Sequence, residues 1–320
     1  MAVGGAGPGM GQGLAWLLRN PDFAVVKTML NHLLRAQDNL ARLEAATAAA
    51  AGPVREGLLA RVACQEGAGW LAHQGRWIHP LDLAMRAAGI TGSVAAAGLG
   101  TRLASVLPST LAASSGQEDG PEDRDVTTAI RQCVLFERLA TLRSWQPDDA
   151  PLAPGDEPAL LAAARMIVAP GGGRLTAAAV LRAAAVWRDH GGSGMPGLVL
   201  WSAPVALLHR VGLLHRAAMA AEALPVVVEA IAEAAGRARR ELVRLQAAEG
   251  RLRGMAATRR SHLPAAAAEV LRRPVVTAGQ MAAALGITSR GAALLLDRMV
   301  AAGVLREATG RRSWRGFVVI

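Results

Sequence analysis

The chain has 320 residues, which is enough for two domains with a sizeable buried core. Its two cysteines, Cys64 and Cys133, form no CxxC spacing, which argues against a disulfide scaffold or a zinc site and for reduced thiols. The formal net charge is +10, so a polyanion is a candidate partner.

The N-terminal segment 1–19 is rich in glycine and lacks the basic and apolar regions of a signal peptide. We expect it to be a disordered tail. Uncharged runs such as Gly191 to Leu208 are interrupted by Gly, Pro and Ser, so they do not predict membrane-spanning helices. The expected location is cytoplasmic, with no membrane contact.

Residues 20–221 are predicted to form a multi-helix domain of unknown function. Apolar residues recur at helical spacing, and the short connections between the helices are typical of antiparallel neighbours. The predicted helices are 23–51, 54–73, 80–89, 126–145, 158–168, 176–190 and 198–223. Two acidic, proline-containing segments, 107–125 and 146–158, are expected to be exposed loops.

One acidic residue of this domain falls inside an apolar helical stretch. Glu66 lies near Trp70 in the sequence, so a buried carboxylate is expected there. A structural pair with a nearby arginine, such as Arg61 or Arg76, explains it better than catalysis.

The segment 222–261 is predicted to be one long connecting helix, because apolar residues recur along it in steps of four and three. Two interpretations stay open: the helix packs on its own chain, or 222–255 forms a homodimer seam that presents two DNA-binding domains to a two-fold-related site. The seam residues are Leu224, Val228, Ile231, Ala235, Ala238, Leu242, Leu245 and Leu252.

Residues 262–320 predict a winged helix-turn-helix. Thr277 can cap a short helix, 278–285, and Gly286 supplies the permissive backbone of the turn. Thr288 can cap a second helix, 289–302, which Gly303 ends. The stretches 304–306 and 317–319 alternate like two strands joined by a basic tip. The predicted fold class is therefore mainly α, with a small β-hairpin wing.

Positive charge concentrates in this part of the chain. Residues 251–320 hold 12 arginines against three acidic residues, a net charge of +9, whereas the first 250 residues sum to +1. This distribution is the electrostatic footprint expected of a protein that binds double-stranded DNA.

The candidate DNA-binding residues lie at the start of the second helix and in the wing. Arg290 is the candidate for a base contact, because a guanidinium can bind guanine bidentately. Phosphate contacts are expected from the helix start and the wing, with thin base readout overall. These residues are Thr288, Ser289, Arg311, Arg312 and Arg315.

Catalytic and cofactor motifs are not found in the sequence. There is no HExxH, and His209 and His215 are six residues apart, so they do not share a helix face at ligand spacing. There is no GxSxG elbow, and the glycines at 171–173 lack the Lys-Ser/Thr of a phosphate loop. We therefore expect no enzyme activity, no metal and no cofactor.

Two stretches resemble a family of uncharacterised alphaproteobacterial proteins that join a domain of unknown function to a C-terminal helix-turn-helix. The first is Arg35 to Ala84, and the second is VVTAGQMAAALGITSRGAALLLDRMVAAGVLREATGRRSWRGFVV, with the LREATGRRSWR wing as its most specific part. The resemblance implies DNA binding and, as the reading we favour, transcriptional regulation.

The same stretches are similar to Fic-family AMP-transferases, whose HPFxxGNGR-like loop this chain lacks. The segment 190–196, HGGSGMP, has a histidine and glycines but neither the acid nor the arginine. This resemblance implies a catalytically silent relative.

Another alternative is a protein-interaction module whose winged domain binds an acidic protein surface. The two acidic loops could also fold over the arginine-rich tail, although solvated linkers explain them more simply.

Overall fold

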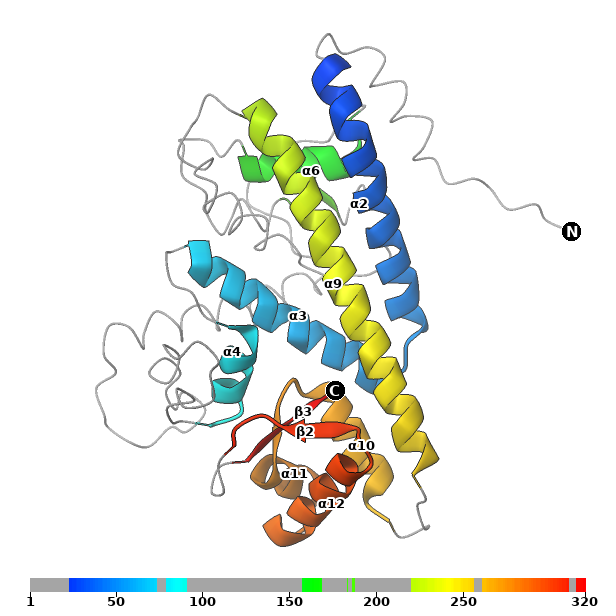
Figure 1. The fold of residues 1–320 in the computed structure, drawn as a ribbon, viewed down its shortest axis with the longest axis vertical. Coiled ribbons are helices and arrows are strands. Elements are labelled where there is room, and N and C mark those ends of the chain that lie inside the picture. Colours follow the sequence, from blue (N-terminus) through cyan, green and yellow to red (C-terminus); the bar gives the residue numbers. More distant parts are fainter. Residues whose placement is uncertain are drawn as a thin grey trace, which may run out of the picture. The chain divides into compact units, whose positions relative to one another are not determined.

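The structure of the protein is a computed structural model (Figure 1), and it describes most of the predicted helices and nearly all of the C-terminal region. The described residues are 23–73, 79–90, 157–168, 183, 186–187, 220–255, 261–310 and 315–320. Several predicted parts lie outside the described residues. They are the N-terminal tail, the helix 126–145, most of the helices 176–190 and 198–223, most of the acidic loops, Arg76 and the wing tip 311–314.

The contacts divide the chain into two compact units. One unit consists of residues 1–45 and 136–237, and the other consists of residues 46–135 and 238–320. Two long helices, α2 (Phe23–Ala49) and α9 (Ala220–Gly254), have residues in both units. Helix α9 begins before the predicted Glu222, and the described helix ends at Gly254.

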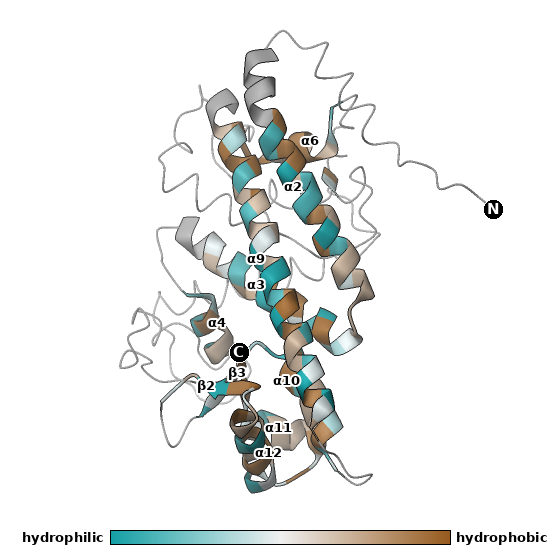
Figure 2. Ribbon diagram, turned by 45° about the vertical axis from the view of Figure 1, so that its right-hand side comes forward, coloured by the Kyte–Doolittle hydropathy of each residue, from teal (hydrophilic) through white to brown (hydrophobic). Residues whose placement is uncertain are grey.

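In the first unit, α2 and the first half of α9 are joined by polar contacts as well as by buried apolar residues. Arg35 and His32 of α2 both pair with Glu229 of α9, with the Arg35 guanidinium 2.8 Å from its carboxylate. Asn39 donates a hydrogen bond to the carbonyl of Ala232. The short helix α6 (Ala159–Val168) is mostly buried in this unit, and Figure 2 colours it as hydrophobic.

The predicted apolar seam of α9 is buried within the chain itself. All eight seam residues are at most 7% exposed, and six of them are completely buried. Residues that already pack inside one chain are not available to a second copy. The packing therefore favours the interpretation that α9 packs on its own chain over a homodimer seam.

The second unit combines the C-terminal region with two helices from the first third of the chain. It contains α3 (Gly52–His73) and α4 (Pro80–Ala87), the second half of α9, and α10 (Leu263–Arg272). After these come β1 (Val276–Thr277), α11 (Ala278–Leu285), α12 (Ser289–Ala301), β2 (Leu305–Glu307) and β3 (Gly316–Val319).

The three strands form one antiparallel sheet in the order β1-β3-β2. Strand β3 pairs with β1 through Val276 opposite Phe317, and with β2 through Arg306 opposite Val318. The mainly α fold with a small C-terminal β-hairpin is confirmed. The predicted strand 304–306 is displaced by one residue from β2, and the predicted strand 317–319 begins one residue after β3 does. The two-residue β1 was not predicted.

Candidate nucleic-acid interface

The helix pair α11 and α12 is held by local capping contacts. The Thr277 hydroxyl accepts a hydrogen bond from the backbone N–H of Gln280, and the Gln280 side chain accepts one from the N–H of Thr277, both at 3.2 Å. This reciprocal pair is a capping box, and it fixes the start of α11. Gly286 ends α11 with φ of 64°, a left-handed conformation that glycine adopts without steric cost.

Helix α12 begins at a second cap. The Thr288 hydroxyl accepts a hydrogen bond from the N–H of Gly291 at 3.1 Å. The hydroxyl proton is not used in this contact, so Thr288 can still donate to a phosphate oxygen. The positive end of the helix dipole lies at the same place, and it favours an anion there.

One face of α12 is buried and the opposite face is exposed. Ala292, Leu296 and Met299 pack inward on α11 and the sheet. The exposed residues are Ser289, Arg290, Leu294, Asp297, Arg298 and Ala301. A helix that is packed against its domain on one face and exposed to solvent on the other can enter a major groove.

Arg290 and Leu294 are the most informative residues of the exposed face. The side chain of Arg290 makes no hydrogen bond or ion pair with any other residue that the structure describes. Leu294 is 63% exposed, which is high for a large apolar side chain in a packed helix. Apolar side chains at such positions can contact the thymine methyl group.

Arg315 at the start of β3 is held by the domain itself. Its Nε lies 2.8 Å from Glu307 and its NH1 2.9 Å from Asp297, and its guanidinium stacks 4.8 Å from the ring centroid of Phe317. The hydrogen bonds to Glu307 and then Asp297 raise the pKa of Arg315. This geometry favours a brace between the wing and α12. The other predicted wing arginines, Arg311 and Arg312, lie outside the described residues.

Several other C-terminal arginines are also used internally. Arg251 of α9 donates hydrogen bonds to the carbonyls of Gly303 and Ile320, at 2.7 and 3.0 Å. Arg272 pairs with Glu56 of α3 at 2.8 Å, and Arg273 pairs with Glu269. Part of the positive charge counted in the sequence therefore holds the domain to its neighbours.

The C-terminal domain is also attached where α10 crosses α3. Gly57 lies so close to α10 that an added Cβ would stand 1.8 Å from the carbonyl oxygen of Leu271. Beside it, Arg61 donates hydrogen bonds to the carbonyls of Leu271 and Arg273, at 3.1 and 2.9 Å. These are orphan carbonyls at the end of α10, so the guanidinium acts as a cap supplied by another helix.

Arg61 is also paired with Glu241 of α9, at 3.1 Å. Burial lowers the pKa of Arg61 to about 10, although the Glu241 carboxylate acts in the opposite direction. The sequence suggested Arg61 as a partner for Glu66. Glu66 is buried as expected, at 3% exposed, but the carboxylate paired with Arg61 is that of Glu241, 180 residues further along the chain.

A second buried carboxylate, Asp82 in α4, was not noticed in the sequence. It is 2% exposed, and neither carboxylate oxygen has a hydrogen-bond partner among the residues that the structure describes. Burial raises its pKa, against the opposing influence of His79 and Arg86. Within the described ranges, no group of three or more His, Cys, Asp or Glu residues could hold a metal ion. In the same part of the chain, no helix is both long and apolar enough to cross a membrane.

The arrangement of α11, the glycine turn and the exposed α12 defines a helix-turn-helix. Residues 263–320 match the family model of an HTH DNA-binding domain. No curated protein matches the chain. The chain thus carries a C-terminal helix-turn-helix DNA-binding domain, which makes it a DNA-binding protein.

Proposed function

We propose that the protein is a transcriptional regulator that binds duplex DNA in the manner of a winged helix-turn-helix. In this proposal, α12 enters the major groove and the β2–β3 hairpin lies beside the phosphate backbone. The proposal assigns no catalytic step to the chain.

The observation that carries the proposal is the exposed face of α12. Ser289 and Arg290 lie in its first turn beside the Thr288 cap, so a base contact and a phosphate contact can be made together. Arg290 is free to bind, because no described residue pairs with it. The connection of α12 to β2 and β3 places a basic hairpin after the groove-reading helix in the chain.

The decisive experiment compares two arginines of equal charge on a duplex selected from random sequence. Arg290→Ala is expected to weaken binding roughly 10- to 100-fold, since a bidentate guanine contact is worth about 1–3 kcal/mol. The matched control is Arg240→Ala, an exposed arginine of α9 that also has no partner among the described residues. It is expected to change affinity by less than about twofold. Equal effects of the two variants would contradict the proposal.

A protein-interaction role is the second candidate, and the exposed Leu294 is the observation that favours it. A large apolar side chain on an otherwise polar face can also serve as an anchor for a protein partner. A co-purifying partner that is lost in Leu294→Ala, with no duplex binding at moderate salt, would favour this role over DNA binding.

A further inference from the structure

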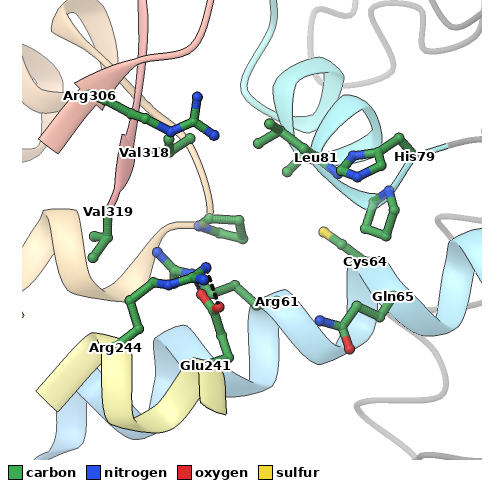
Figure 3. A pocket seen from close by; sticks show the side chains of 13 residues that line it. Arg61, Cys64, Gln65, His79, Leu81, Glu241, Arg244, Arg306, Val318 and Val319 are labelled. Carbon is green, nitrogen blue, oxygen red and sulfur yellow. Dashed lines mark hydrogen bonds and ion pairs between the residues drawn. The ribbon is translucent and has the colours of Figure 1, made fainter. Parts of the chain in front are cut away.

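A cavity with charged and apolar lining lies within the second unit, on the side of the sheet where α3, α4 and α9 meet the C-terminal domain. Its volume is about 280 Å³, close to the lower end of the roughly 300–1,000 Å³ typical of small-molecule sites. Figure 3 shows Arg306 reaching from β2 toward Leu81 and His79 of α4, with Arg61, Glu241 and Arg244 grouped across the cavity from them.

The charges that line the cavity are unbalanced. Three arginines, Arg61, Arg244 and Arg306, face a single carboxylate, Glu241. Glu241 is already shared, because one oxygen lies 3.1 Å from Arg61 and the other lies 2.9 Å from Arg244. Asp82 does not line the cavity. The lining therefore carries an excess of two positive charges, which favours an anionic occupant.

The hydrogen-bond donors available to an occupant come from both sides. The side chain of Arg306 makes no hydrogen bond or ion pair with another described residue, so its whole guanidinium is available. Arg244 pairs with Glu241 through its NH1 group, and its side chain is 54% exposed, so other N–H donors of its guanidinium are available. His79 caps α4 by accepting from the N–H of Leu81 at its Nδ1, so the neutral ring carries its proton on Nε2. That N–H is a further donor at the cavity.

Most of the remaining lining is apolar, with the side-chain amide of Gln65 as a polar exception. Leu81, Val318 and Val319 contribute aliphatic surface, and Pro80 and Pro274 contribute two rings. A bare inorganic ion would leave this surface uncovered. An occupant with an anionic head and a compact apolar body satisfies both parts of the lining.

We propose that this cavity binds a small organic anion, a carboxylate or phosphate ester, whose charged head is held by Arg306, Arg244 and His79. The inference does not depend on DNA binding. A backbone phosphate of DNA has the same charge, but it carries a deoxyribose in place of a compact apolar group that could cover Leu81 and Val318.

The test uses the full chain with phenyl phosphate and benzoate as probes, and sodium chloride at matched ionic strength as the reference. Calorimetric titration is expected to show saturable binding of at least one probe with a stoichiometry of one. Arg306→Gln and Arg244→Gln are each expected to weaken it roughly tenfold or more, as for a lost charged hydrogen bond. Circular dichroism verifies that the variants are folded.

Arg290→Gln and Arg240→Gln are the controls, and both are expected to bind the probe as the unmodified protein does. The proposal is overturned if neither probe binds saturably, or if binding survives in Arg306→Gln and Arg244→Gln. It is also overturned if Arg290→Gln abolishes probe binding, because the probe would then occupy the α12 face. If Arg306→Gln and Arg244→Gln weaken duplex binding as much as Arg290→Gln and no probe binds, the cavity holds a DNA phosphate instead.

Discussion

The C-terminal domain has two sides that use arginine in opposite ways. On the side facing α3 and α9, Arg61 and Arg251 donate to backbone carbonyls, and Arg272 pairs with Glu56. On the exposed side of α12, Arg290 has no partner among the described residues. A guanidinium that is already saturated stabilises the fold, and one that is free can bind a ligand. Net charge alone does not distinguish these two uses.

The largest expected effect is a loss of stability when an arginine whose guanidinium is bonded within the fold is removed. Arg61→Met should lower the free energy of unfolding by about 3–5 kcal/mol, because it uncaps the end of α10 and removes the buried partner of Glu241. Chemical denaturation measures the loss. The matched change Arg240→Met, at an exposed position, should stay within about 0.5 kcal/mol. A similar loss in both variants would show that the position of the arginine is irrelevant.

A smaller effect is expected at the crossing of α3 and α10. Gly57→Ala should destabilise the protein by about 1–3 kcal/mol, because its Cβ meets the carbonyl of Leu271 and the helices must separate. The control is Gly250→Ala in α9, where nothing lies within 4 Å of the added Cβ. There we expect a gain of about 0.5–1 kcal/mol from helix propensity. Thermal unfolding of the two variants gives the comparison, and a stable Gly57→Ala would argue against so close a crossing.

The smallest expected effects distinguish Arg315, which connects the wing to α12, from the wing arginines that are predicted to contact phosphates. Arg315→Gln should cost less than about 1 kcal/mol of stability, since its ion pairs are partly exposed, and should leave the salt dependence of DNA affinity unchanged. The double change Arg311→Ala/Arg312→Ala should reduce the slope of log affinity against log salt by about 2. The opposite pattern would assign the phosphate contacts to Arg315.

The parts of the fold that depend on nearby residues could be predicted from the sequence. The bounds of α11 are those predicted, because Thr277, Gln280 and Gly286 fix both of its ends locally. Strand β1 was missed, because its two residues become a strand only by pairing with β3, 40 residues away. The role of Arg61 between α10 and α9 was also out of reach, since its partners on those helices lie 180 to 212 residues along the chain.

The same reasoning applies to the candidate interface. Arg290 lies on the exposed face of α12, because helical spacing places it opposite the buried Ala292 and Leu296. Its base contact stays a prediction. Arg315 has the same charge and lies in the predicted wing, yet Asp297 and Glu307 hold it. Its partner Asp297 is on another element, so only the folded arrangement reveals the pairing.

The most direct test of the account asks which exposed surface touches DNA. Leu294 on α12 and Val243 on α9 are both large apolar side chains, 63% and 59% exposed. A photoreactive amino acid placed at either position can be cross-linked to a bound duplex. The account predicts cross-links from position 294 and none from position 243. Cross-links from position 243 without any from position 294 would contradict the assignment of α12 as the DNA-binding helix.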